Sequence, residues 1–341
     1  MDVVVTSRRR FVGTLLVGLS LLSLGSCAVP PEEAATLAVT EATKPVLTTQ
    51  PGAVRFAVIG DSGRGSREQY ELAAQMVVQR ERFPFNFVIM LGDNIYGGAT
   101  ARDYRDKFER PYRTLLDDDV KFYAARGNHD EGEQWQYPLF NMGGHRYFTF
   151  RQRGGAIGAL TGTDVQFFAV DSVSPDARQL AWLERELEAS EARWKIAFFH
   201  HPIYTSGRYA WHSVLARRRI EPVLRYHGVN AVFSGHEHLY ERIAPQAGVA
   251  YFVSGGAGSV RRGDFRPSAI SAAGYDRDLH FMLVEIAGDT MRFEAISRTG
   301  TLVDAGMIRQ VSARDASPPP PRRAQLPVPD AGSRQRLDVA R

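Results

Sequence analysis

Residues 235–242 are Gly-His-Glu-His-Leu-Tyr-Glu-Arg, and they follow an apolar run at 229–233 that is typical of a buried strand. Two histidines two positions apart point to the same side only on an extended or loop-like backbone, because on a helix they lie about 200° apart. We therefore expect a strand that ends in a turn and directs the imidazoles of His236 and His238 into one space. The pair fits a metal site, and taken alone it fits two solvated loop histidines equally well.

Four other predicted strands end in side chains that could complete such a site. Their ends are Gly60-Asp61-Ser62-Gly63 after 54–59, Gly92-Asp93-Asn94-Ile95-Tyr96 after 87–91, Arg126-Gly127-Asn128-His129-Asp130 after 120–125, and His200-His201-Pro202 after 194–199. Polar clusters at the carboxyl ends of strands are typical of sites in α/β sheets. These strand ends favour the metal site over the solvated loop.

Predicted helices alternate with strands in the first half of the chain, and strands follow one another in the second half. The helices cover 66–80, 176–189 and 213–226, and the remaining strands cover 165–170, 249–254, 279–286, 290–297 and 301–308. The alternation predicts parallel crossovers, and the strands from residue 249 onward predict an antiparallel extension. We expect an α/β fold in which two mixed sheets form a sandwich with helices outside.

The composition is that of a soluble globular protein, with 44% apolar and 23% charged residues among 341. The formal net charge is +4, and three arginines against one aspartate in residues 1–26 account for +2 of it. The remaining charge gives no case for nucleic-acid binding. The single cysteine, Cys27, excludes a disulfide framework and a thiolate zinc site.

The N-terminal residues resemble the export signal of a bacterial lipoprotein. Arg8-Arg9-Arg10 precedes an apolar run at 11–24, Leu24-Gly25-Ser26-Cys27 resembles a lipobox, and Ser7-Arg8-Arg9-Arg10-Phe11 resembles the twin-arginine signal. The resemblance implies a signal peptide over 1–26 and lipid attachment at Cys27. The protein would then be exported and anchored in the membrane of the cell envelope, on its periplasmic or outer side. The alternatives are an ordinary signal peptide and an uncleaved helix, although the run is shorter than the roughly 20 residues that span a bilayer.

The folded domain is predicted to cover 53–310. Residues 27–52 are rich in Ala, Pro, Glu and Thr without periodicity, which predicts a flexible tether. Residues 311–341 include four consecutive prolines at 318–321, and their composition predicts a disordered tail. No stretch inside the domain has the composition of a linker, so we expect a single unit there.

Seven side chains at the strand ends could bind metal ions. They are Asp61, Asp93, Tyr96, Asn128, His200, His236 and His238. Carboxylate and imidazole together suit divalent and trivalent ions, and seven ligands are too many for one four-coordinate zinc ion. They suit two ions about 3.5–4 Å apart that share a bridging carboxylate. Such a pair serves phosphoester hydrolysis, because one ion supplies hydroxide from a bound water while both stabilise charge on the phosphoryl oxygens.

Tyr96 bears on the identity of the metal. A free phenol has a pKa near 10, so at neutral pH it becomes a ligand only when a strong Lewis acid removes its proton. A trivalent ion such as Fe(III) does so more readily than Zn(II), which favours one ferric ion. The alternative is that Tyr96 packs beside the site without binding metal.

Five sequence blocks resemble those of the calcineurin-like metallophosphoesterases. They are Asp-x-Gly at 61–63, Gly-Asp-x-x-Tyr at 92–96, Gly-Asn-His-Asp at 127–130, His-x-Pro at 200–202 and Gly-His-x-His at 235–238. The tyrosine block and the whole stretch at 235–242 resemble the purple acid phosphatase branch, and Gly-Asp-Asn-Ile-Tyr with Gly-Asn-His-Asp resembles its small tartrate-resistant form. The likeness covers 54–300, and five blocks in order are specific where one alone is weak. Asp130 departs from the pattern, because many members have glutamate there.

The resemblance implies a four-layer metallophosphoesterase sandwich, a two-metal centre and hydrolysis of phosphomonoesters by attack of a metal-bound hydroxide. By the family pattern, Asp61, Tyr96 and His238 would hold the ferric ion, Asn128, His200 and His236 would hold a divalent ion (Fe, Zn or Mn), and Asp93 would bridge the two. His129 would contact the phosphate or protonate the leaving alkoxide, a role worth about 10²–10⁴ in rate. The alternative for His129 is to orient Asp93 or a water.

Two further histidines are weaker candidates for substrate contact. His201 lies next to a predicted ligand and also fits a supporting position beside the metals. His212 lies in a Gly/Tyr-rich loop after the His-x-Pro block, and it also fits an ordinary surface position.

Three other functions fit part of the pattern. Gly60-Asp61-Ser62 resembles the nucleophile block of the Gly-Asp-Ser lipases, but that class needs a late Asp-x-x-His pair, and no aspartate in this sequence has a histidine three residues on. A phosphodiesterase or nucleotidase on the same scaffold would differ in pocket walls that the sequence does not show. A binding-only protein would have a decayed site, whereas all seven ligand positions carry competent residues. We therefore expect a phosphomonoesterase.

Overall fold

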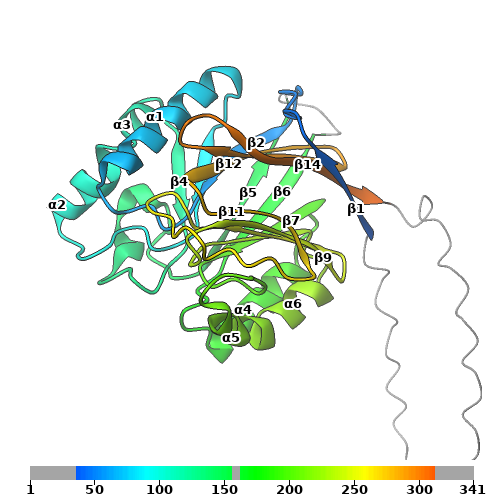
Figure 1. Cartoon of the computed structure of the whole chain (residues 1–341). Helices are drawn as coiled ribbons and strands as arrows, with labels where there is room; N and C mark the ends of the chain where they lie inside the picture. Colours follow the sequence, from blue (N-terminus) through cyan, green and yellow to red (C-terminus); the bar gives the residue numbers. More distant parts are fainter. Residues whose placement is uncertain (1–35, 156–161, 312–341) are drawn as a thin grey trace, which may run out of the picture. The chain divides into compact units, whose positions relative to one another are not determined.

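The computed structural model describes residues 36–155 and 162–311, which form two seven-stranded sheets with helices on their outer faces (Figure 1). Each sheet contains both parallel and antiparallel pairs. The predicted α/β sandwich of two mixed sheets flanked by helices is therefore confirmed.

The first sheet has the order β1-β14-β13-β12-β2-β3-β4. Its strands are β1 (Thr36–Ala42), β2 (Val54–Ile59), β3 (Phe87–Met90), β4 (Lys121–Ala124), β12 (His280–Ala287), β13 (Thr290–Ser297) and β14 (Leu302–Val311). The pairs β2–β3 and β3–β4 are parallel, so the carboxyl ends of these three strands lie along one edge of the sheet. The other pairs are antiparallel.

The second sheet has the order β11-β9-β10-β8-β7-β6-β5. Its strands are β5 (Phe148–Arg153), β6 (Asp164–Ala169), β7 (Trp194–Phe199), β8 (Ala231–Ser234), β9 (Tyr240–Gln246), β10 (Val249–Ser254) and β11 (Ser271–Tyr275). The strands β6, β7, β8 and β10 run parallel, and β5, β9 and β11 are antiparallel to their neighbours.

Helices cover the outer face of each sheet (Figure 1). Beside the first sheet lie α1 (Arg67–Arg82), α2 (Ala101–Tyr104), the π-helical turn η1 (Arg105–Glu109) and α3 (Arg113–Asp117); beside the second lie α4 (Ala177–Glu188), α5 (Ser213–Arg219) and α6 (Glu221–Tyr226). Three short 3₁₀ turns are η2 (Gln134–Gln136), η3 (Pro138–Phe140) and η4 (Ala210–His212). Ser66 caps α1, because its hydroxyl accepts a hydrogen bond from the Gln69 N–H at 3.3 Å.

The strand β2 shows why the parallel strands are nearly uninterrupted apolar runs. Phe56 and Val58 point into the core between the two sheets, whereas Ala57 and Ile59 pack under the helices on the outside. Both faces of β2 are buried, so apolar residues do not alternate regularly with polar residues along the strand. Phe56 meets Phe167 of the second sheet edge to face, with ring centroids 5.2 Å apart. Such contacts fix the two sheets against each other and therefore fix the loops at their ends.

Residues 36–50, which the sequence assigned to a flexible tether, belong to the folded domain. The strand β1 pairs antiparallel with β14 along its whole length. Further on, the backbone N–H of Val46 donates to Glu294 at 2.7 Å, and that of Gln50 donates to Glu285 at 2.6 Å. The tether prediction is wrong here because these partners lie more than 230 residues away in the sequence and leave no local pattern.

Two details of the predicted secondary structure are also wrong. The run of strands from residue 249 is not a simple antiparallel extension, because β10 pairs parallel with β8 as well as antiparallel with β9. The helix predicted over 213–226 is two helices that meet at Ile220. Pro222, in the first turn of α6, has no N–H to continue a single helix across that point.

No helix in the described ranges is long and apolar enough to cross a membrane. The predicted signal peptide, the lipid-attachment residue Cys27 and the tail from residue 312 lie outside the described residues. Export and lipid anchoring stay predictions.

Candidate active site

The loops after β2, β3, β4, β7 and β8 bring the predicted metal ligands together. Asp61, Asp93 and His200 each offer a ligand atom that lies within 4.8 Å of those of the other two. Asp61 and Asp93 follow strands of the first sheet, whereas His200 follows a strand of the second. The site therefore lies where the carboxyl ends of parallel strands from both sheets meet, as the strand-end pattern predicts.

Three predicted ligands have a left-handed backbone conformation. The φ angle is 57° at Asp61, 51° at Asp93 and 71° at His236. Such a conformation costs of order 1–3 kcal/mol for a non-glycine residue and persists only where the surroundings hold it. Hydrogen bonds within the site do so, since the His236 N–H donates to Asp61 Oδ2 at 2.8 Å and the His129 N–H donates to Asp93 Oδ1 at 2.8 Å. These turns direct three donor side chains into the site.

The donor atoms predicted to hold the first ion converge. The Tyr96 hydroxyl lies 3.2 Å from Asp61 Oδ1 and 3.2 Å from His238 Nε2. His238 Nε2 is 3.4 Å from the same Asp61 oxygen. The other ring nitrogen of His238 lies 2.8 Å from the Ser259 hydroxyl, which fixes the orientation of the ring. A carboxylate oxygen of Asp61, the hydroxyl oxygen of Tyr96 and an imidazole nitrogen of His238 therefore lie around a common point.

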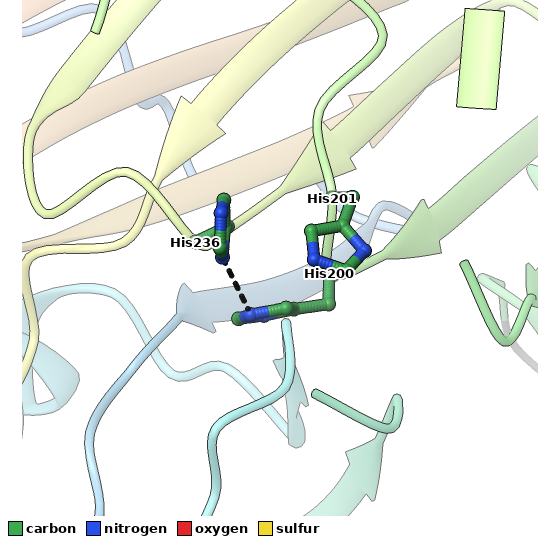
Figure 2. Close-up of side chains that lie close together, drawn as sticks. All are labelled: His200, His201 and His236. Atoms are coloured by element: carbon green, nitrogen blue, oxygen red, sulfur yellow. Dashed lines mark hydrogen bonds between the residues drawn. The ribbon is translucent and has the colours of Figure 1, made fainter. Parts of the chain in front are cut away.

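The donor atoms predicted to hold the second ion also converge. His200 Nε2 lies 2.9 Å from Asn128 Oδ1. It also lies 3.1 Å from His236 Nδ1 (Figure 2). The same nitrogen is 3.4 Å from Asp93 Oδ1, which connects this group to the predicted bridging carboxylate. His200 Nδ1 donates to the Leu91 carbonyl at 3.0 Å, so the lone pair of His200 is on Nε2, the nitrogen that faces the site.

Burial controls the charges of these groups. It lowers the pKa of His236 to about 2 and that of His238 to about 3, and it also holds the pKa of His200 well below its usual value. The three imidazoles are therefore neutral and can act as metal ligands. Burial, followed by repulsion from Asp93, raises the pKa of Asp61 well above its usual value.

The donor set fits the two-metal centre that the sequence predicts. Within the described ranges, no lysine or arginine lies at ion-pair distance from Asp61 or Asp93, although both carboxylates are almost fully buried. Two buried carboxylates with neutral histidines around them need a compensating positive charge. Metal ions between these groups would supply it, and carboxylate, imidazole, amide and phenol are suitable ligands for such ions.

Asp130 fastens two of the ligand loops together, a role that the sequence analysis did not predict. Its carboxylate accepts hydrogen bonds from the backbone N–H groups of Asn94 and Gly127 at 2.7 Å each, and from the Asn94 side chain at 2.8 Å. Burial, followed by the charge of Asp93, raises the pKa of Asp130 to about 7 against these bonds. The residue thus holds the loop after β3 against the loop after β4.

The three other predicted histidines surround the ligands. The exposed ring of His129 lies 5.1 Å from the Tyr96 ring between centroids, on the accessible side of the site. His201 lies beside His200 and His236 and could offer a ligand atom to the same group (Figure 2). His212 Nδ1 lies 2.6 Å from Nε2 of His236, on the nitrogen that does not face His200. His212 is thus placed to orient a predicted ligand, and its substrate contact stays a prediction.

Two buried glutamates of the 235–242 stretch hold the loop that carries His212. Glu237 accepts a hydrogen bond from the Tyr209 N–H at 2.5 Å, and Glu241 accepts from the Ser206 N–H at 2.8 Å. Both glutamates are fully buried. Residues 235–242, which provide two predicted ligands, therefore also fix the loop that carries His212 beside His236. In the sequence, only the spacing of the two glutamates could have suggested this role.

Comparisons with known proteins agree with this geometry. The sequence model of the calcineurin-like phosphoesterase family matches residues 54–240, more than half of the chain. Purple acid phosphatase 17 of Arabidopsis thaliana is 27% identical over 252 residues, which are 64% of this chain and 73% of that protein. Human tartrate-resistant acid phosphatase type 5 is 24% identical over 241 residues, which are 60% of this chain and 72% of that protein.

Solved structures with the same fold include GAP50, the anchor in the inner membrane complex of Plasmodium, with a TM-score of 0.67 at 17% identity over 76% of this chain and 90% of that one. A purple acid phosphatase from yellow lupin seeds has a TM-score of 0.59 at 16% identity over 80% of this chain and 58% of that one. These likenesses establish the fold, and the sequence matches establish the enzyme class as a hydrolase. The chain belongs to the calcineurin-like phosphoesterase family, in its purple acid phosphatase branch.

Proposed function

We propose that the protein hydrolyses phosphomonoesters at a two-metal centre held by Asp61, Asp93, Tyr96, Asn128, His200, His236 and His238. The observation that supports this most is the convergence of these seven side chains from two sheets. Buried carboxylates and neutral imidazoles meet there without a lysine or arginine at ion-pair distance within the described residues. The family match supports a phosphoesterase, and the relatives named as acid phosphatases favour monoesters.

The ion beside Tyr96 is proposed to be trivalent. Burial and the charges of Asp61 and Asp93 raise the pKa of the Tyr96 phenol far above its ordinary value. Only a strong Lewis acid would convert this phenol into a ligand at the pH of the reaction, which favours Fe(III) over a divalent ion. When bound, the two ions would acidify a water molecule that serves as the nucleophile and would neutralise the phosphoryl oxygens.

His129 is proposed as the proton donor to the leaving alkoxide. Its backbone N–H is held on Asp93, whereas its ring is exposed beside Tyr96. The ring can therefore reach an ester oxygen on the accessible side of the site while the main chain stays fixed. Asp93 accepts this backbone bond through Oδ1, the oxygen that also lies 3.4 Å from His200.

The variant Asp93→Asn tests the proposal. Purified wild-type protein should contain two metal ions per chain and release 4-nitrophenol faster from 4-nitrophenyl phosphate than from bis(4-nitrophenyl) phosphate. The variant should lose metal and fall at least about 10²–10³-fold in activity, because the carboxylate between the two ligand groups is replaced by a neutral amide. The control Asp117→Asn alters a surface ion pair with Arg113 and should behave as wild type.

Three outcomes would separate the alternatives. Near-normal activity of Asp93→Asn would refute the bridging role. Preference for the diester would favour a phosphodiesterase on the same scaffold. A purple or pink protein would support a tyrosinate bound to Fe(III), and a colourless active protein would refute that part of the proposal.

A further inference from the structure

Two arginines, Arg64 and Arg261, lie beside the predicted metal ligands, and neither has a carboxylate at ion-pair distance in the described ranges. Arg64 follows β2 in the loop that begins with Asp61, and Arg261 follows β10 in a loop that also contains Ser259. The two loops touch, since a Cβ atom on Gly258 would lie 2.9 Å from Cγ of Arg64. Both arginines therefore belong to one side of the site, next to the group predicted to hold the first ion.

Arg261 is half-buried at the edge of the site. Its Nη1 atom is enclosed and has no hydrogen-bond partner. Its guanidinium carbon lies 5.3 Å from the ring centroid of Tyr209, and its backbone N–H donates to the carbonyl of His238 at 3.4 Å. An enclosed guanidinium nitrogen without an acceptor is costly, and it leaves the charge of Arg261 only partly compensated. Because the residue as a whole is only half-buried, an anion would bind through the remaining part of the guanidinium group.

Arg64 is exposed and stacks on a predicted ligand. Its guanidinium carbon lies 3.9 Å from the ring centroid of Tyr96, whose hydroxyl contacts Asp61 and His238. The face of the Arg64 guanidinium stacks on the phenol, so its N–H groups, which lie in the plane of the guanidinium, can bind an anion from solvent.

The charge pattern distinguishes these arginines from others near the same loops. Arg126 and Arg146, which follow β4 and precede β5, are both paired with the buried carboxylate of Asp171 at 3.3 and 2.7 Å. Arg146 also pairs with Asp176 at 3.5 Å, so two carboxylates compensate the two positive charges. In the described part of the chain neither Arg64 nor Arg261 forms an ion pair with a carboxylate, although the charge of Arg261 acts at longer range on the buried Asp61 and Glu237.

We propose that Arg64 and Arg261 form a subsite for a second anionic group of the substrate, so that the preferred phosphomonoester also carries a carboxylate or a second phosphate. This inference rests on the proposed function. The reacting phosphoryl group would occupy the predicted metal centre, and the second anion would lie against the two guanidinium groups. Guanidinium binds carboxylate and phosphate through two parallel hydrogen bonds, which gives the pair both charge and directional selectivity.

Substrate pairs that differ in one anionic group test this subsite. Glycerol 3-phosphate and 3-phosphoglycerate differ by a carboxylate, and fructose 6-phosphate and fructose 1,6-bisphosphate differ by a second phosphate at a longer distance. The wild-type protein should have the higher kcat/KM for the doubly anionic member of at least one pair. Arg261→Gln should lower that preference about tenfold or more, as expected for a charge-assisted hydrogen bond in a partly buried site. Arg64→Gln, at an exposed position, should lower it about two- to fivefold.

Arg262→Gln is the matched control. Arg262 adjoins Arg261 in sequence, but its side chain is exposed and donates to the carbonyl of Arg277 at 3.0 Å. The control removes the same charge from the same loop and should leave the preference unchanged. Equal losses on both members of each pair in Arg261→Gln would overturn the subsite, because they would mean that Arg261 only supports Tyr209 or the metal ligands.

A binding measurement separates failure of this inference from failure of the proposed function. If the metal-loaded wild-type protein hydrolyses none of the four esters, the proposed phosphomonoesterase activity fails. Calorimetric titration of the same protein with 3-phosphoglycerate and glycerol 3-phosphate then decides the subsite. A tighter Kd for 3-phosphoglycerate that is lost in Arg261→Gln and kept in Arg262→Gln supports it, and equal Kd values overturn it.

Discussion

The imidazole of His280 should limit the stability of the fold in acid. His280 begins β12, is fully buried, and lies 5.8 Å from the ring of Tyr240 between centroids. Burial lowers its pKa to about 4, against the opposing effects of the Asp278 backbone and of the Asp278 charge. Its backbone N–H donates to the carbonyl of Gly256, in the loop that leads to Arg261. Protonation of this ring would therefore place a charge next to a loop of the active site.

The sign and size of the effect follow from the two pKa values. In the unfolded chain His280 has the ordinary pKa of about 6.5, so below that pH the unfolded state binds a proton that the folded state does not. The contribution of neutral His280 to the free energy of unfolding is therefore fully present above pH 6.5, and it is lost as the pH falls towards 4. Relative to pH 7, the loss amounts to roughly 2 kcal/mol at pH 5 and roughly 3 kcal/mol at pH 4. This is a large share of the 5–15 kcal/mol typical of a domain.

The assay is the free energy of unfolding by urea at several pH values between 7 and 4, for the wild type and for His280→Leu. The variant has no group to titrate at this position, so its stability should fall less steeply in acid, and the difference between the two proteins should change by roughly 3 kcal/mol across the range. His145→Leu is the control, because His145 is exposed and its ring is in water in both states. Parallel curves for wild type and His280→Leu would refute the reasoning.

Two further predictions concern the metal ligands. His212→Ala should weaken metal binding about 10–100-fold, measured by titration of the metal-free protein, because it removes the group that holds Nε2 of His236; unchanged affinity would leave His212 to a substrate role. Gly127→Ala should abolish metal binding and activity, because a Cβ there would overlap the backbone N and Oδ1 of Asp93. Gly97→Ala, whose added Cβ has no atom within 4 Å, is the control for an added methyl group without overlap, and a similar loss of metal in both variants would contradict the proposed overlap.

The parts of the fold that could be predicted from the sequence are those with a local pattern. The strands β2, β7, β10 and β13 have the predicted bounds, because apolar runs with both faces buried are visible in the sequence itself. The strands β5 and β11 contain only half-buried and exposed residues, without a buried apolar run, and therefore lack such a signal. The parallel pairing of β10 with β8 was missed for a different reason, since the order of strands in a sheet is a property of the whole chain.

The candidate site divides in the same way. Its seven ligands could be proposed from the sequence because each follows a recognisable strand, and ligand chemistry restricts the residue types that can occur there. Asp130 and Arg261 were not predicted, because their roles depend on which distant loops they touch. Asp130 bonds to Asn94, 36 residues earlier, and Arg261 meets Tyr209 of a loop after another strand. A residue type shows that such a contact is possible, but only the packing of the loops shows where it occurs.

The strained conformations at Asp61, Asp93 and His236 connect the stability of the fold to the chemistry of the site. Each bends the chain directly after a strand, and each is held by bonds that involve another ligand loop, such as the bond from the His236 N–H to Asp61. Asp130 adds a second link between the loops after β3 and β4. Hydrogen bonds between the loops therefore offset the free-energy cost of the strain and of the buried carboxylates. Because hydrogen bonds within the chain hold these loops, binding of metal ions by the predicted ligands should require little further ordering of the loops.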